Sequence, residues 1–215
     1  LSTWQQIFKG PIFPINNYGF SDTEFVLKSK SFPQAKRNFL FFSSWSQVGK
    51  GLDLLLEIFP RHPHLHLYVC SNFKNESDFC RCYRKELYGT PNIHAVGIIR
   101  VNGPKYNELM KKCAYVILPT AAEGQSGAVI QCMWSGLIPV VTKETGIDIG
   151  EFGFMFSDDS PEEIERIILK ANELPEVDLK EYSVRTRETC EKKYSEEAFN
   201  KRWRDIINKL SQAAI

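Results

Sequence analysis

The sequence lacks an excess of charge of either sign. Its 27 lysine and arginine residues nearly balance 26 aspartate and glutamate residues, so the formal net charge is +1 and the pI is near 7.7. Nucleic acids and anionic membranes attract proteins through clustered positive charge, and the composition gives no such excess. We therefore expect no nucleic-acid partner, and any anion-binding site must be local.

The sequence also lacks targeting and membrane-spanning segments. Residues 1–9 have neither the basic flank nor the apolar stretch of a secretory signal. The longest uncharged run, residues 124–142, contains glutamine, serine, glycine and proline, which favours a helix, a turn and a strand of a globular domain. Because the chain begins with Leu1, we expect a piece of a longer cytoplasmic protein, and peripheral membrane contact of that parent chain stays open.

Neither a disulfide framework nor a metal centre is indicated. A chain of 215 residues can bury a full core without disulfides, so the six cysteines are expected to be reduced thiols. Cys80 and Cys82 have one intervening residue, which fits neither a zinc finger nor a redox pair, and we interpret them as two helical thiols. His62, His64 and His66 alternate into a strand. We interpret them as its solvent-facing edge, because no nearby carboxylate or thiol completes a metal shell.

From residue 38 onward, short apolar runs rich in aromatic and β-branched residues alternate with helical patterns. This alternation predicts an α/β fold, a Rossmann-like parallel sheet sandwiched by helices. The predicted strands span residues 39–43, 66–71, 93–99, 115–119, 138–142 and 152–156. The predicted helices span residues 50–59, 76–87, 105–112, 127–134, 161–172, 185–193 and 195–210.

Two helical patterns near the end of the chain are the clearest. Ser160 is typical of an N-cap, with proline at the first helical position and Glu163 completing a capping box. In the last helix, apolar side chains recur at helical spacing, which predicts a face buried in the core. These residues are Phe199, Trp203, Ile206 and Leu210.

The chain divides into three predicted segments. Residues 1–36 hold prolines and aromatic residues without a clear period, and we expect an interdomain segment packed against the domain, with an exposed linker as the alternative. Residues 37–193 form the predicted Rossmann-like domain, and residues 194–215 form a C-terminal helix.

Two loops after predicted strands are suited to bind an anion. In an open parallel sheet, ligands bind beyond the carboxyl ends of the strands. Residues 43–51 (SSWSQVGKG) offer hydroxyl groups, Lys50, and two glycines that allow close backbone approach. Residues 120–127 (TAAEGQSG) open a helix, whose free N–H groups and positive dipole end favour a phosphate. Together the loops predict a diphosphate cradle, although Lys50 taken alone also fits a solvated lysine, and Gly124 and Gly127 a tight turn.

Three segments carry a resemblance to a known family. Residues 41–57 (FFSSWSQVGKGLDLLLE), 96–98 (VGI) and 115–141 (YVILPTAAEGQSGAVIQCMWSGLIPVV) resemble the donor-binding half of a GT-B retaining glycosyltransferase of glycosyltransferase family 4, and the likeness spans residues 38–175. The resemblance implies a hexosyltransferase-type enzyme without metal or cofactor. Its C-terminal domain would bind a nucleotide-diphosphate sugar, and an N-terminal domain would hold a glycan, lipid or other small-molecule acceptor. The resemblance also implies that this half alone transfers no sugar.

Carried over to this sequence, the resemblance assigns roles to individual residues. Lys50 matches a lysine that contacts the donor diphosphate and stabilises the departing nucleotide. Glu123 matches a glutamate near the donor sugar hydroxyls. Gly97 and Ile98 resemble the place where backbone groups hold the base. The complete set of expected donor contacts, of which Lys50 and Glu123 are expected to be catalytic, is Ser44, Trp45, Gly49, Lys50, Gly97, Ile98, Glu123, Gly124, Gln125, Ser126, Gly127 and Gln131.

The sequence departs from the family pattern at two positions. Trp45 stands where the family has an arginine, and its ring could stack on a donor or acceptor ring or pack in the domain cleft. Gln131 stands where the family has a second glutamate, and a neutral amide binds ribose hydroxyls less strongly than a carboxylate. Two alternatives therefore stay open: a nucleotide-sugar binding module that has lost turnover, and a GT-B-shaped sugar-nucleotide epimerase.

Overall fold

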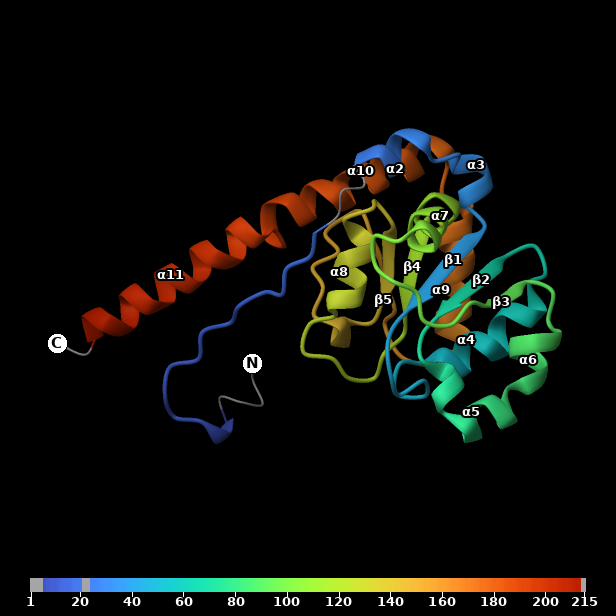
Figure 1. The fold of residues 1–215 in the computed structure, drawn as a ribbon, viewed down its shortest axis with the longest axis horizontal. Helices are drawn as coiled ribbons and strands as arrows, with labels where there is room; N and C mark the ends of the chain where they lie inside the picture. The colour runs from blue at the N-terminus through green and yellow to red at the C-terminus, as the bar shows by residue number, and fades with distance from the viewer. Residues whose placement is uncertain (1–5, 21–23, 214–215) are drawn as a thin grey trace.

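A six-stranded, all-parallel sheet forms the centre of the protein, as the computed structural model shows for residues 6–20 and 24–213 (Figure 1). The strand order is β3-β2-β1-β4-β5-β6. The strands are β1 (Asn38–Phe42), β2 (His66–Cys70), β3 (Ile93–Ala95), β4 (Tyr115–Leu118), β5 (Ile138–Val141) and β6 (Phe154–Met155). This architecture confirms the α/β, Rossmann-like prediction.

Helices flank the sheet. They are α2 (Glu24–Ser29), α3 (Phe32–Ala35), α4 (Leu52–Ile58), α5 (Ser77–Cys82), α6 (Arg84–Gly89), α7 (Pro104–Lys112), α8 (Gly127–Met133), α9 (Pro161–Glu173), α10 (Glu176–Lys193) and α11 (Glu196–Ala213). Short 3-10 turns follow α4 (Phe59–Arg61), β2 (Phe73–Asn75) and β5 (Lys143–Thr145). Helix α4 contacts α6 and α9, and α8 contacts α10 and three of the central strands.

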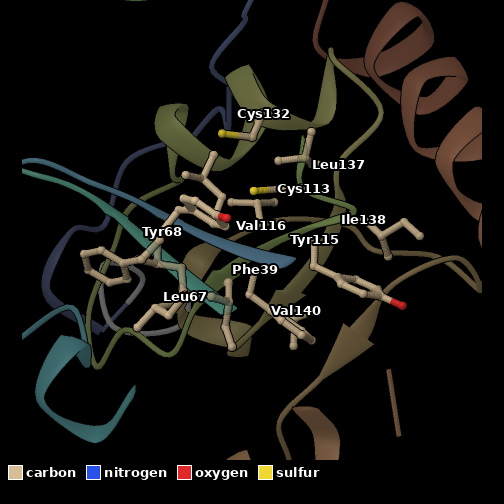
Figure 2. Packing of buried hydrophobic residues seen from close by; sticks show 14 of the residues in the cluster. Phe39, Leu67, Tyr68, Cys113, Tyr115, Val116, Cys132, Leu137, Ile138 and Val140 are labelled. Atoms are coloured by element: carbon tan, nitrogen blue, oxygen red, sulfur yellow. The ribbon is translucent and has the colours of Figure 1, made fainter. Parts of the chain in front are cut away.

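The core lies on both faces of the central strands. Every residue of β4 is buried, and the Phe39 ring on β1 stacks on the Tyr115 ring at 4.7 Å between centroids (Figure 2). The Tyr115 hydroxyl donates a hydrogen bond to the Ala171 carbonyl of α9. Such uniformly apolar strands are stable only where helices cover both sides, which explains why β1 and β4 show no polar alternation.

Several element boundaries differ from the predictions for a local reason. The predicted helix 76–87 is two helices, α5 and α6, that break at Tyr83. Helix α4 begins at Leu52 rather than at residue 50, because Gly51 before it is left-handed with φ +72°. Strand β3 ends at Ala95 rather than at residue 99, since Gly97 has φ +87° and cannot continue a strand. Strand β6 keeps only two residues of the predicted 152–156.

The C-terminal helices differ more strongly. Helix α10 begins at Glu176, nine residues before the predicted start. Helix α11 leads away from the sheet (Figure 1), and Trp203 and Leu210 are 44% and 47% exposed. In the stripe predicted to be core, only Ile206 is buried. The prediction of a buried face was therefore wrong for most of the stripe, because this helix extends beyond the domain.

The N-terminal segment follows α8 and α10 before it reaches the sheet. The Gly19 amide donates to the Tyr194 carbonyl at 3.0 Å, and the Lys30 ammonium donates to the Cys113 carbonyl at 2.9 Å. Ile7 and Phe8, in contrast, are 73% and 55% exposed. Residues 1–5 and 21–23 of this segment lie outside the described residues, and its assignment as an interdomain segment stays a prediction, as do the other domain limits.

The described residues allow two further statements. All six cysteines carry free thiols, and Cys80 and Cys82 both lie on α5. Across 6–20 and 24–213, no helix combines the length and apolar character needed to cross a bilayer.

Candidate functional site

The two loops that the sequence singles out meet at the carboxyl edge of the sheet. Strands β1 and β4 are parallel neighbours, and the strand order reverses between them. The loop after β1 and the loop after β4 therefore leave the sheet side by side, at the switch point where α/β folds bind ligands. The Gly49 carbonyl accepts hydrogen bonds from the Ala121 amide and the Thr120 hydroxyl, both at 3.1 Å. These bonds tie the two loops together.

Gly51 fixes how closely the two loops approach. Its φ of +72° is left-handed, and a Cβ atom there would lie 2.2 Å from the Pro119 carbonyl oxygen at the end of β4. Only glycine fits both conditions. The backbone that carries Lys50 is thus held directly against the loop that carries Glu123.

Lys50 and Glu123 form an ion pair across the two loops. The Lys50 ammonium donates to Glu123 Oε1 at 2.5 Å, and the two side chains are 16% and 23% exposed. The residues are 73 positions apart in sequence, so only the fold brings them together. The site presents one cation and one carboxylate, both accessible to solvent, at one place on the sheet edge.

The loop that carries Glu123 leads into α8, and open space adjoins the start of that helix. Ser126 is the N-cap, and its hydroxyl accepts from the Val129 amide at 3.4 Å. The amides of Gly127 and Ala128 lie in the first turn, where a helix offers no carbonyl partner. Cβ atoms added to Gly124 and Gly127 would meet no atom within 4 Å, and neither glycine has a left-handed φ. Neither the backbone nor the protein's own packing therefore requires glycine at these positions.

Two of the expected donor contacts are occupied by the N-terminal segment. Gln125 Nε2 donates to the Gly146 carbonyl at 2.9 Å, while its Oε1 accepts from the Asn17 amide at 2.6 Å. Gln131 Nε2 donates to the Phe20 carbonyl at 2.5 Å. Both side-chain amides thus bind the protein's own backbone. Sequence reasoning missed Asn17 and Phe20, because their partners lie more than a hundred residues away.

The first loop keeps its shape through a carboxylate that sequence reasoning also missed. Glu76 accepts hydrogen bonds from the amides of Ser46 and Gln47 at 2.8 and 3.1 Å. Ser46 is left-handed with φ +66°, a conformation that needs such support. The Ser44 carbonyl accepts from Gln47 Nε2 at 2.9 Å. Trp45, between these residues, is 55% exposed and does not belong to the core.

Gly97 and Ile98 lie at a different part of the same edge. They follow β3, which is separated from β1 by β2. The Val69 carbonyl of β2 accepts from the Gly97 amide at 3.1 Å, and Ile98 is 70% exposed. A Cβ atom on Gly97 would lie 3.6 Å from the Lys74 ammonium nitrogen. The structure thus places an exposed backbone segment and a lysine at this end of the edge, away from the Lys50–Glu123 pair.

A hollow of about 310 Å³ adjoins the second loop at the ends of β4, β5 and β6. Its lining includes Thr120, Ala121, Lys143 and Asp158, and the Lys50–Glu123 pair lies outside it. Among the residues that the structure describes, no three histidine, cysteine or carboxylate side chains are grouped to hold a metal ion.

A family comparison assigns the chain to a family. The family model described as "Glycosyl transferases group 1" matches residues 36–173, more than half of the chain, and this range contains both loops. The chain belongs to the glycosyl transferases group 1 family. The family resemblance seen in the sequence is thereby confirmed. No curated protein matches the chain by sequence.

Several solved structures share the fold. A TarM mutant from S. aureus, in complex with Fondaparinux, alpha-GlcNAc-glycerol and UDP, superposes with a TM-score of 0.73 at 18% identity, over 96% of this chain and 42% of that one. HepE from Anabaena, in complex with UDP and glucose, gives 0.66 at 18% identity, over 93% and 55%. Sucrose-phosphate synthase from Thermosynechococcus elongatus gives 0.70 at 14% identity, over 99% and 56%.

These neighbours are GT-B glycosyltransferases, and the likeness establishes a GT-B, Rossmann-like fold for this chain. The chain spans about half the length of each of them.

Proposed function

We propose that this chain is the donor-binding domain of a retaining glycosyltransferase that takes its sugar from a nucleotide-diphosphate donor. The observation that carries the proposal is the Lys50–Glu123 pair on two loops tied together at the switch point of the sheet, in a chain of the group 1 family. The UDP bound in the TarM and HepE structures supports a nucleotide-diphosphate ligand.

Lys50 is suited to stabilise the leaving group. When the bond between the sugar's anomeric carbon and the diphosphate oxygen breaks, negative charge accumulates on the departing diphosphate. The attraction between that oxygen and a cation fixed beside it is stronger in the transition state than in the ground state, and this difference accelerates the reaction. The diphosphate would take Lys50 as its counter-ion, and the open space at Gly124 and Gly127 would admit the phosphates next to first-turn amides.

Glu123 is suited to orient the sugar. A carboxylate accepts hydrogen bonds from sugar hydroxyl groups, and its partial exposure keeps it accessible to a ligand. In the proposal, Glu123 exchanges its bond with Lys50 for sugar hydroxyls when the donor binds. Gly97 and Ile98 would contact the base, and the acceptor would be held outside this chain.

One alternative has a specific observation in its favour. Trp45 replaces a family cation, and the Gln131 amide already binds the Phe20 carbonyl. Both features would weaken donor binding, as in a nucleotide-sugar binding module without turnover. A sugar-nucleotide epimerase has no such observation in its favour.

The binding test uses the chain itself. Thermal shifts with a panel of nucleoside diphosphates and their nucleosides should find a diphosphate that stabilises the fold by mass action. Lys50→Ala should weaken binding of that diphosphate about tenfold or more, because a charge-assisted hydrogen bond is lost, and leave nucleoside binding unchanged. Lys170→Ala, which removes an exposed lysine on α9, is the matched control.

Equal losses for diphosphate and nucleoside would contradict the role of Lys50. Sugar transfer by the parent protein distinguishes the enzyme from the binding module: a parent protein that binds the donor but transfers no sugar to any acceptor supports the module. Inversion at a ring carbon of the sugar supports the epimerase.

A further inference from the structure

A second hollow lies at the opposite edge of the sheet. It has a volume of about 510 Å³ and lies at the amino ends of β1 and β2, beside the end of α7. Figure 1 shows α3 leading into β1 at this edge, away from the loop between β1 and α4. The hollow is therefore separate from the proposed donor site.

The lining of the hollow includes two cations and no carboxylate. Arg37 enters it from the residue before β1, and Lys112 from the last turn of α7. In the described part of the chain neither side chain forms an ion pair, whereas Glu108, one turn before Lys112, is paired with Lys105 at 2.9 Å. The Lys112 ammonium lies 5.0 Å from the centre of the Tyr68 ring, which forms one wall. Two cations thus share one cavity whose lining holds no carboxylate, while the Tyr68 hydroxyl and Glu108, which lies outside that lining, raise the pKa of Lys112.

His66 lines the hollow, and His94 lies against it. His66 Nδ1 lies 3.2 Å from His94 Nε2, and the two rings stack at 5.3 Å between centroids. Burial lowers the pKa of both imidazoles, and the Lys112 ammonium lowers it further. Arg37, before β1, also acts on His66, and the Tyr68 ring of β2 stacks on His94 at 4.3 Å between centroids. Glu108 on α7 acts on Tyr68 and Lys112. Burial is thus the first cause of both lowered pKa values, and the neighbouring cations add to it.

We propose that this hollow binds a tetrahedral oxyanion of the phosphate class. Arg37 offers a planar fork of donors that fits two oxygens, and Lys112 offers a point charge. A bound anion would also favour protonation of His66, which would then donate to it. The wall of Tyr68 and the absence of carboxylates in the lining favour an anion over a metal ion, although two histidine nitrogens lie close together.

The anion can come from a free phosphate compound or from a lipid headgroup. Both sources present the oxygens of a tetrahedral phosphate group, so the hollow would recognise the same group in either. The proposal does not depend on the proposed sugar-transfer function, since its residues lie at the other edge of the sheet.

The test follows the imidazole signals of His66 and His94 by NMR in the isotope-labelled chain. Sulfate serves as the probe. Histidines titrate between about pH 5 and pH 8, and the charge of sulfate is constant over that range. We expect saturable shifts of both signals and a rise in their titration midpoints. Arg37→Gln and Lys112→Gln should each weaken sulfate binding about tenfold. Lys85→Gln, at an exposed lysine on α6, should leave it unchanged.

The donor-site variant Lys50→Ala should keep the full histidine response, which separates this site from the proposed donor site. Arg37 and Lys112 are exposed, so their glutamine variants should keep the circular dichroism spectrum of the parent chain. Histidine signals that do not move with sulfate, or that move equally with chloride at the same ionic strength, would overturn the proposal. So would unchanged sulfate binding by both variants.

Two further arms identify the source of the anion. Inorganic phosphate is titrated in place of sulfate, and phosphatidylcholine vesicles with and without phosphatidic acid are sedimented with the chain. Vesicle binding that requires phosphatidic acid and is lost in Lys112→Gln indicates a headgroup. Phosphate binding without vesicle binding indicates a free compound. Failure of both arms contradicts the proposal.

Discussion

Replacing Gly127 by alanine separates the stability of the fold from binding of the donor. Gly127 is the first residue of α8, its φ is not left-handed, and an added Cβ atom would meet nothing within 4 Å. Alanine loses less backbone entropy than glycine on folding, so Gly127→Ala should stabilise the fold by up to about 0.5–1 kcal/mol. In a domain of this size that corresponds to a melting temperature higher by roughly 1–4 °C.

The same methyl group should oppose ligand binding. If the space at Gly127 receives the diphosphate, an added methyl group overpacks the bound state, which typically costs about 1–3 kcal/mol. The dissociation constant for a nucleoside diphosphate should therefore rise about 5- to 150-fold. Calorimetry gives the binding constant, and thermal unfolding of the free chain gives the stability.

Gly51→Ala is the matched control. There the backbone is left-handed and the added Cβ would lie 2.2 Å from the Pro119 carbonyl oxygen, so the fold should lose about 2 kcal/mol or more. Opposite signs of the stability change in the two variants would support the geometry described here. A Gly127→Ala variant that binds diphosphate as tightly as the parent chain would refute the placement of the phosphates.

Three further predictions concern single side chains. Glu123→Gln should lower sugar transfer by the parent protein more than nucleotide affinity, as kinetics and calorimetry would show, and unchanged turnover would count against its role with the sugar. Gln131→Glu should destabilise the fold by about 1–3 kcal/mol in urea unfolding, because a carboxylate cannot donate to the Phe20 carbonyl, and an unchanged midpoint would show that this contact contributes nothing. The Arg166 guanidinium and Ser157 lower the pKa of Glu163 from its ordinary 4.5 to about 2, so the stability it contributes is present above pH 4.5 and lost as pH falls towards 2. The difference in unfolding free energy between the parent chain and Glu163→Gln should shrink over that interval, and a constant difference would contradict the linkage.

The sheet could be predicted from the sequence because its signal is local. Strands covered on both faces read as uniform apolar runs, and β1, β2, β4 and β5 begin within one residue of their predicted starts. The N-cap at Ser160 is equally local: its hydroxyl accepts from the Glu163 amide at 3.3 Å, as predicted. The second half of the predicted capping box does not form, because the Ser160 amide donates to Asp158 and the Glu163 carboxylate accepts from Ser157.

Features that depend on tertiary context could not be predicted. Helix α10 buries Leu179 together with small polar residues such as Ser183 and Thr186, so the apolar period that marks a helix is weak there. The stripe on α11 has a strong period, but period alone does not say whether a partner surface is present in the same domain.

In the candidate site, too, some features have a local sequence signal and others depend on tertiary contacts. The loops and Lys50 could be found from composition, since glycines, hydroxyls and a lysine follow a strand. The contact of Lys50 with Glu123 required the parallel pairing of β1 and β4. The hydrogen bonds of Gln125 and Gln131 with the N-terminal segment could not be predicted, because the sequence carries no periodic signal for the path of that segment along α8.

A crystal structure of the chain with a nucleoside diphosphate tests the central claim most directly. We predict that the diphosphate lies between the Lys50 ammonium and the amides of Gly127 and Ala128, with the Lys50–Glu123 bond broken. An ordered nucleotide whose phosphates contact neither Lys50 nor the start of α8 would contradict it.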